Sequence, residues 1–196
     1  MTAFVLSLIV IFVAELGDKS QLMALTFATR FRALPVLAGI TIATAIVHLV
    51  SVLLGAAVGA VLPTGPISIL AGIAFFGFAA WTLRGDELTE NERRRAAAAS
   101  RSAILAVGGA FFLAELGDKT MLATVTLAAD NPGISDLIGV WAGSTVGMVA
   151  ADALAIGAGR LLGTRLPERA IKIGAAVAFA AFGVLLVIDG VRTLTS

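Results

Sequence analysis

The sequence contains the same charged hexapeptide twice, and each copy lies inside a long apolar run. Residues 15–20 (ELGDKS) recur 100 positions later as residues 115–120 (ELGDKT). Ionisable side chains are costly to place within a lipid bilayer, and those found there usually line pathways for ions or protons. The duplication therefore predicts a functional site in a membrane protein, built from two related halves of the chain.

The composition is that of a membrane protein. Of the 196 residues, 59% are hydrophobic and 14% are charged, and the mean hydropathy is +1.00, so the chain holds more apolar surface than one soluble core would bury. A formal net charge of +1 gives no basis for nucleic-acid binding. The lack of cysteine disfavours disulfides and soft-metal sites. No basic leader or cleavage signal precedes residue 24, so we expect the first apolar run to be retained.

Six apolar segments have the length of a membrane span. A hydrocarbon core about 30 Å thick requires about 20 helical residues, and lipid offers no hydrogen-bond partners to an open backbone. None of the segments shows the period-two alternation of a strand. We therefore predict an all-α membrane protein with six transmembrane helices, at residues 3–26, 35–61, 66–84, 102–128, 136–159 and 170–190.

Three spans per half is an odd number, so the second half must enter the membrane from the opposite side. We expect two inverted three-helix repeats, residues 1–84 and 102–196, joined by a cytoplasmic linker at 85–101 into one membrane domain. Such repeats suit alternating access to a site near the midplane. The positive-inside rule places both termini outside. It rests on the basic residues of the first, third and fifth loops: Arg30, Arg32, Arg84, Arg93, Arg94, Arg95, Arg101, Arg160, Arg165, Arg169 and Lys172.

The motif carboxylates are the candidate metal ligands. Glu15 and Asp18 are three residues apart and are therefore expected on one helical face, and the same holds for Glu115 and Asp118. Four converging carboxylates would suit a hard or borderline divalent cation such as Mn²⁺, Ca²⁺ or Mg²⁺. The glycine in each motif permits close helix contact or a local loosening of the helix. Further candidate oxygen ligands are Ser20, Thr120, Thr26, Thr126 and Gln21.

Other polar side chains within the predicted spans suggest proton chemistry or ion pairing. Lys19 and Lys119 leave the four motif carboxylates with two excess negative charges, which one divalent ion or two protons would neutralise. These lysines either hold the carboxylates apart or carry protons. Asp152 is either a ligand or proton relay, or a buried partner for a lysine. His48 either shuttles protons or forms a hydrogen bond between helices. Asp189, near the end of the last span, is interpreted as interfacial.

Both hexapeptides match the pattern E-x-G-D-K-[ST], and the chain thereby resembles the six-helix Gdt-type exchangers. That family includes Golgi manganese/calcium–proton exchangers and bacterial manganese exporters. The resemblance covers essentially the whole chain in span count and motif placement. It implies export of a divalent cation, Mn²⁺ before Ca²⁺, driven by proton entry, with both motifs in the cation path. The compact chain with its short loops favours a prokaryotic manganese exporter, and we therefore expect a bacterial plasma membrane location, with the metal ion as cargo and no prosthetic group.

Other functions are compatible with some of these features. An exporter of small organic cations or amino acids shares the size, but it would need apolar or aromatic recognition groups at the midplane. An intramembrane hydrolase could use paired carboxylates as acid and base. The chain lacks the H-E-x-x-H and G-x-S-x-G patterns, however, and hydrolysis leaves the duplication unexplained, so we expect no enzyme. A channel differs from an exchanger because its metal flux is not coupled to proton flux.

Overall fold

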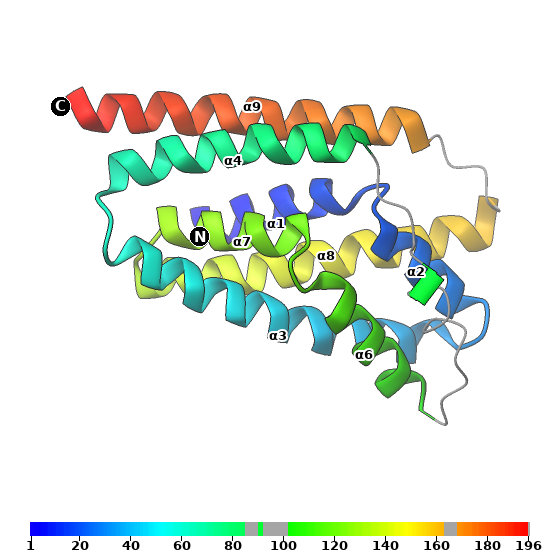
Figure 1. Cartoon of the computed structure of the whole chain (residues 1–196). Coiled ribbons are helices and arrows are strands. Elements are labelled where there is room, and N and C mark those ends of the chain that lie inside the picture. The colour runs from blue at the N-terminus through cyan, green and yellow to red at the C-terminus, as the bar shows by residue number, and fades with distance from the viewer. Residues whose placement is uncertain (85–89, 92–101, 163–167, 196) are drawn as a thin grey trace.

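The computed structural model describes residues 1–84, 90–91, 102–162 and 168–195, and this part of the chain is helical without strands (Figure 1). Most of the predicted linker, with Arg93, Arg94, Arg95 and Arg101, lies outside the described residues, as does Arg165. The helices are α1 (Thr2–Glu15), α2 (Lys19–Ala28), α3 (Ala33–Gly59), α4 (Thr64–Arg84), α6 (Ala103–Glu115), α7 (Lys119–Asp130), α8 (Ile134–Leu162) and α9 (Glu168–Thr195).

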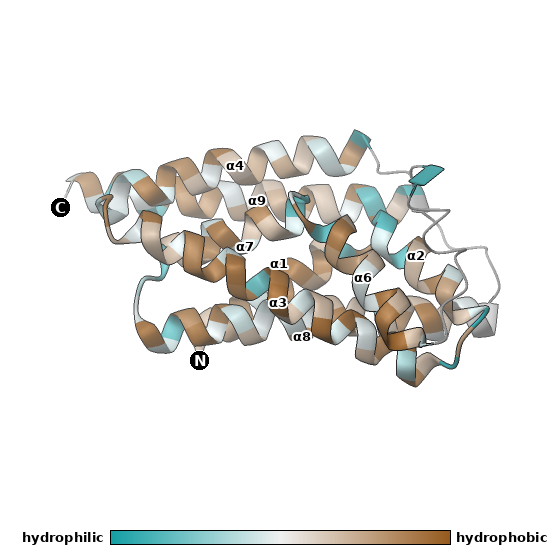
Figure 2. Ribbon diagram, turned by 60° about the horizontal axis from the view of Figure 1, so that its bottom comes forward, coloured by the Kyte–Doolittle hydropathy of each residue, from teal (hydrophilic) through white to brown (hydrophobic). Residues whose placement is uncertain are grey.

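In the described part of the chain, four helices are long and apolar enough to cross a bilayer. They are α3, α4, α8 and α9, and they agree within a few residues with four of the predicted segments. Their outward surfaces carry exposed leucine, isoleucine and valine side chains, and Figure 2 shows apolar residues along the length of the bundle. A surface of this kind is stable in contact with lipid. The chain is therefore an integral membrane protein.

The segments predicted at 3–26 and 102–128 are not single helices, which corrects the sequence analysis. Each is broken at the motif, between α1 and α2 and between α6 and α7. Gly17 and Gly117 have φ angles of +75° and +79°, a left-handed conformation that only glycine adopts at little cost. Asp18 and Asp118 are extended and precede the next helix. Glu15 and Asp18 therefore lie on either side of a break and not on one helical face.

The two broken segments run in opposite directions through the bundle. In Figure 1, α1 leads into α2 toward the right, whereas α6 leads into α7 toward the left. Both termini lie at the same end of the molecule as the turns at 60–63 and 131–133. The helices α4 and α9 form an antiparallel pair along one side, while α1 packs on α8 and α3 packs on α6 and α7. The broken segments thus pass through the middle of the bundle.

One helix contact recurs at the spacing of the motifs. A Cβ atom on Gly39 of α3 would lie 2.9 Å from the carbonyl oxygen of Ile104 in α6. A Cβ atom on Gly139 of α8 would lie 3.1 Å from the amide nitrogen of Phe4 in α1. Glycines allow helix backbones to approach closely in membranes, where packing and hydrogen bonds hold helices together. The α3–α6 and α8–α1 contacts therefore use corresponding residues of the two halves.

Other contacts differ between the halves. A Cβ atom on Gly59 of α3 would lie 2.6 Å from the carbonyl oxygen of Ala129, so α3 and α7 meet backbone to backbone. At the corresponding place Gly159 of α8 meets the side chain of Leu25, which holds α2 farther away. In addition α7 packs on α4, whereas the described residues of α2 make no comparable packing with α9. The end of the bundle that contains α7 is therefore more tightly packed than the end that contains α2.

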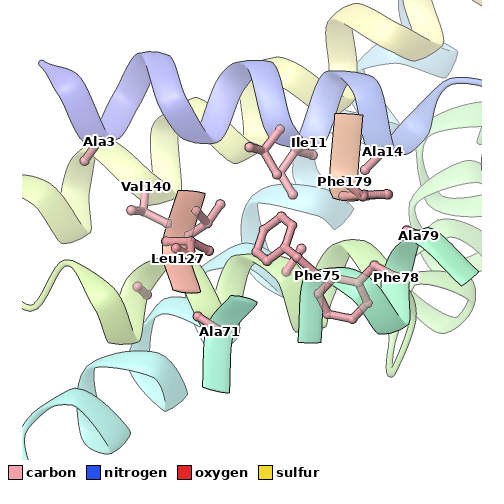
Figure 3. Close-up of a cluster of buried hydrophobic side chains, with 14 of the residues drawn as sticks. Ala3, Ile11, Ala14, Ala71, Phe75, Phe78, Ala79, Leu127, Val140 and Phe179 are labelled. Atoms are coloured by element: carbon pink, nitrogen blue, oxygen red, sulfur yellow. The ribbon is translucent and has the colours of Figure 1, made fainter. Parts of the chain in front are cut away.

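An apolar core joins the α4–α9 pair to the central helices. Phe75 of α4 lies at its centre, with its ring centroid 5.7 Å from that of Phe179 in α9 and 5.5 Å from those of Phe78 and Phe182. Figure 3 shows the ring of Phe75 next to Ile11 of α1. Aromatic pairs at such distances contribute about 0.5–1.5 kcal/mol each beyond their burial. This core fixes α1, and with it the position of the first motif.

Candidate functional site

The structure brings the two motif copies together in the interior of the bundle. Lys119 Nζ forms an ion pair with Asp18 Oδ1, and Lys19 Nζ lies 3.3 Å from Asp118 Oδ1. Each lysine thus pairs with the aspartate of the other copy. Because each aspartate directly precedes the first residue of α2 or α7, the two helix starts lie next to each other. We expected the carboxylates to converge, but we did not predict this reciprocal pairing from the sequence.

Five carboxyl groups are buried at this site. Glu15, Asp18, Glu115 and Asp118 are joined by Asp152 of α8, and each of the five is at most 3% exposed. The negative charges of Glu115, Asp18 and Asp152 all act on Glu15, as does the positive charge of Lys119. Five carboxylates against two ammonium groups leave a formal excess of three negative charges. That excess is larger than the motifs alone provide, and it favours bound cations or protons.

The carboxyl groups differ in how they are bonded. Ser20 Oγ donates a hydrogen bond to Asp18 Oδ2 at 3.3 Å, and Thr120 Oγ1 donates one to Glu115 Oε2 at 2.9 Å. Among the described residues, neither oxygen of Glu15 has a hydrogen-bond partner, and the same is true of Asp152. A buried polar group without a partner is costly, so such groups in a native fold call for an explanation.

The break in the first motif is tied to α8 by Gln21. The amide of Gly17 donates to Gln21 Oε1 at 2.8 Å, and Gln21 Nε2 donates to the carbonyl oxygen of Ala151 at 3.0 Å. In the second motif the amide of Gly117 lies 3.2 Å from Met121 Sδ, which makes no corresponding link. The sequence showed that these positions differ. It did not show that the glutamine amide bonds to protein groups on both sides.

The structure uses Thr26 and Thr126 differently from the sequence analysis. Both were counted there as candidate oxygen ligands. Each hydroxyl donates a hydrogen bond of 2.8 Å to a carbonyl four residues earlier in its own helix. Both side chains are partly exposed, unlike the motif carboxylates. These two hydroxyls therefore serve their own helices.

His48 takes part in a hydrogen bond between α3 and α8. Its Nδ1 lies 3.2 Å from Thr145 Oγ1, and the Thr145 hydroxyl donates to the carbonyl oxygen of Trp141 at 2.8 Å. Because that hydroxyl has one hydrogen, which is directed to Trp141, this hydrogen-bond pattern assigns the proton of the His48 contact to Nδ1. A role for His48 in proton transfer stays a prediction. A second link, from Thr124 Oγ1 to Ser144 Oγ at 3.3 Å, joins α7 to α8 and was missed.

A further carboxylate lies beyond the predicted spans, at the end of α7. Asp130 Oδ1 accepts a hydrogen bond of 2.5 Å from Ser68 Oγ of α4. Burial raises the pKa of Asp130 and the negative charge of Asp189 raises it further, while the Ser68 hydrogen bond acts in the opposite direction. Asp189 itself is exposed, as its interfacial interpretation requires. Asp130 was not singled out in the sequence, because the terminal residue of an apolar segment carries no distinguishing pattern.

The buried acids can bind an entering cation in place of a lysine ammonium group. Within the described parts of the chain, no three acidic or histidine side chains are grouped so as to hold one metal ion. The two lysines instead balance Asp18 and Asp118. A cation that enters must therefore displace an ammonium group or bind to the acids that lack a lysine. Oxygen donors of this type suit hard divalent ions and protons.

Comparison with known proteins gives a consistent result. The model of one protein family, described as "Divalent cation/proton antiporter GDT1", matches residues 3–90 and 103–194. A "Putative manganese exporter" of Vibrio cholerae is 33% identical over 173 residues, which is 88% of this chain and 84% of that protein. "GDT1-like protein sll0615" of Synechocystis is 29% identical over 94% of this chain and 96% of its own length.

The matches extend to plants. "GDT1-like protein 2, chloroplastic" of Oryza sativa is 32% identical over 93% of this chain, which spans 60% of the length of the rice protein. No solved structure matches.

Proposed function

The chain belongs to the GDT1 family of divalent cation/proton antiporters, and from this premise we propose that it exports Mn²⁺ in exchange for protons, with Ca²⁺ as a second substrate. Members of the family are transporters and not enzymes, which excludes the hydrolase considered above. The preference for Mn²⁺ is supported by the manganese exporter to which the chain is similar. The observation that carries the proposal is the reciprocal pairing of the two motif lysines with two buried aspartates across the motif copies.

The cation binds among Glu15, Asp18, Glu115 and Asp118, near the middle of the membrane. Their burial supports this assignment, since buried carboxylates need compensating positive charge. In the proposed cycle a divalent ion takes the place of a lysine contact, and protons neutralise the carboxylates after the ion leaves. Hydroxyls that already bond the motif acids are available as further oxygen ligands, namely those of Ser20 and Thr120.

The fold consists of six spans in two inverted repeats, 1–84 and 102–196, with a linker at 85–101. In this arrangement α1 with α2 forms one discontinuous span, and α6 with α7 forms its counterpart. Three observations support it: the matching φ angles at the breaks, the recurring glycine contacts and the opposite courses of the broken segments in Figure 1. Discontinuous helices that meet at the midplane are a common way to build an ion site in secondary transporters.

Transport proceeds by alternating access. The two ends of the bundle differ in packing, with α7 held against α3 and α4 and α2 held less closely. If the linker end is cytoplasmic and both termini are outside, the more tightly packed end faces outward. In the alternative conformation α2 closes onto α8 and α9 while α7 separates from α3 and α4. Inverted repeats allow this exchange because each half can adopt the packing of the other.

The proposal is tested with purified protein reconstituted into vesicles. External Mn²⁺ or Ca²⁺ is added with and without an imposed proton gradient, and internal metal and internal pH are recorded together. We expect metal uptake coupled to proton efflux, faster for Mn²⁺ than for Ca²⁺. Glu15→Gln and Asp118→Asn are expected to abolish the coupled flux, and Asp189→Asn, an exposed carboxylate, serves as the matched control.

Three results would contradict the proposal. Metal flux without any proton movement indicates a channel. Normal coupled flux in both motif variants removes the motifs from the cation path. Proton-coupled movement of small organic cations or amino acids, with none of Mn²⁺ or Ca²⁺, favours the other class of exporter.

A further inference from the structure

We propose that Asp152 is a ligand of the transported cation and that it makes the cation site one-sided, centred on Glu15 and not shared equally by the two motifs. This inference rests on the proposed export function and extends it to a residue outside both motifs. It identifies the acids that a divalent cation binds first. It also predicts which motif determines the affinity.

The buried acids differ in whether their oxygens already have bonding partners. Asp18 is paired with Lys119, Asp118 with Lys19, and Glu115 accepts a hydrogen bond from a threonine. Glu15 and Asp152 are each fully buried, and none of their four carboxyl oxygens has a hydrogen-bond partner among the described residues. Glu15 and Asp152 are therefore the two acids of this cluster whose oxygens a cation can all engage without displacing a lysine or a hydroxyl hydrogen bond.

Glu15 and Asp152 lie on two helices that pack against each other. Glu15 ends α1, Asp152 lies on α8, and these two helices pack extensively against each other. The charge of Asp152 acts on Glu15 and on Glu115, and the charge of Asp18 acts on Asp152. The two acids without hydrogen-bond partners thus face one cluster. Carboxylate oxygens brought together from separate helices are the ligands that Mn²⁺ and Ca²⁺ accept.

Asp152 has no counterpart in the first half of the chain. The position 100 residues before Asp152 is Val52, which is buried in the apolar core. The neighbouring carbonyl of Ala151 accepts the hydrogen bond from Gln21, whereas the second motif has a methionine at the corresponding place. Asp152 and the hydrogen bond from Gln21, neither of which has a counterpart in the other half, therefore lie on the same side of the site. Asp152 is held beside the break in the first motif.

The experiment measures binding of Mn²⁺ alone to purified full-length protein at fixed pH, by the loss of the paramagnetic resonance signal of free Mn²⁺. The variants are Asp152→Asn, Glu15→Gln and Glu115→Gln, with Asp189→Asn as the control. We expect Asp152→Asn and Glu15→Gln to weaken binding roughly 10–100-fold, the range found when groups around a metal site are removed. Glu115→Gln is expected to weaken it less, and the control not at all.

The outcomes separate the two proposals. The one-sided site is overturned if Asp152→Asn binds Mn²⁺ with wild-type affinity while Glu15→Gln and Glu115→Gln lose binding to equal degrees. That result leaves the proposed function standing. Unchanged binding and unchanged coupled flux in Glu15→Gln and Glu115→Gln refute the proposed function itself.

A second variant covers the case in which Asp152→Asn does not fold, as judged by size-exclusion chromatography. Asp152→Glu keeps the charge and moves the carboxylate outward by one methylene group. If Asp152 is a ligand, this change alters the ratio of Mn²⁺ to Ca²⁺ affinity, which a purely structural role would not do. A folded Asp152→Glu protein with the wild-type ratio overturns the proposal.

Discussion

Replacing Lys119 with methionine is expected to destabilise the protein more than the same replacement of Lys19. Both changes remove an ammonium group and keep a side chain of similar length. The side chains of Lys119 and Asp18 are 3% and 0% exposed, whereas that of Lys19 is 17% exposed beside an Asp118 side chain at 1%. Loss of Lys119 therefore removes a positive charge from beside a buried carboxylate in the less hydrated of the two places.

The magnitude follows from this difference in burial. Removing one partner of a buried ion pair typically costs about 3–5 kcal/mol, because the remaining charge stays desolvated. Pairs at a protein surface contribute about 0–1 kcal/mol. We expect Lys119→Met to approach the first range and Lys19→Met to fall between the two. Adding Asp18→Asn to Lys119→Met removes the remaining charge and should restore much of the lost stability.

The assay is reversible unfolding in mixed micelles with increasing SDS, carried out with and without Mn²⁺. A ligand that binds only the folded protein stabilises it in proportion to the logarithm of its concentration over Kd. Because a divalent ion supplies the missing positive charge, Mn²⁺ should stabilise Lys119→Met by more than it stabilises the wild type. Equal stability of the two lysine variants, or no added benefit from Mn²⁺, would refute the reasoning.

Three further predictions follow from backbone geometry and from one carboxylate outside the spans. Gly17→Ala and Gly117→Ala should each lower the free energy of unfolding by about 1–2 kcal/mol, because the φ angles of both glycines are positive. Gly17→Ala should be the more destabilising, because its Cβ would lie 3.3 Å from a side chain of α9. Equal shifts in the thermal unfolding temperature would contradict this. Gly55→Ala should lower the free energy of unfolding by about 1–3 kcal/mol, because the added methyl group meets the backbone of α7. The control is Gly77→Ala, whose methyl group would meet nothing within 4 Å and which should leave the thermal unfolding temperature unchanged. Burial raises the pKa of Asp130, so the folded state binds a proton that the unfolded state, with a pKa of about 3.9, has released. Stability of the wild type should therefore fall as the pH rises between the two pKa values, and denaturation of Asp130→Asn should lack this component; identical pH profiles would contradict the assignment.

The sequence by itself determined that the chain is a helical membrane protein, and it indicated a candidate site. Long apolar segments leave the backbone no hydrogen-bond partners except its own, so α3, α4, α8 and α9 could be placed within a few residues. Ionisable residues repeated inside such segments are too costly to be incidental, which indicated both motifs as the candidate site. These inferences depend only on local composition and repetition, which a sequence contains in full.

Only the tertiary structure decided how the site is built. Hydropathy adds contributions residue by residue and does not depend on φ, so the sequence left close helix contact and local loosening as alternatives at Gly17 and Gly117, and only the structure shows a break at each. Which lysine pairs with which aspartate, and which acids are left without a hydrogen-bond partner, depends on the helices that meet in space. Asp152 shows the difference most clearly. Its charge could be read from the sequence, but its place beside Glu15 arises from the packing of α8 against α1.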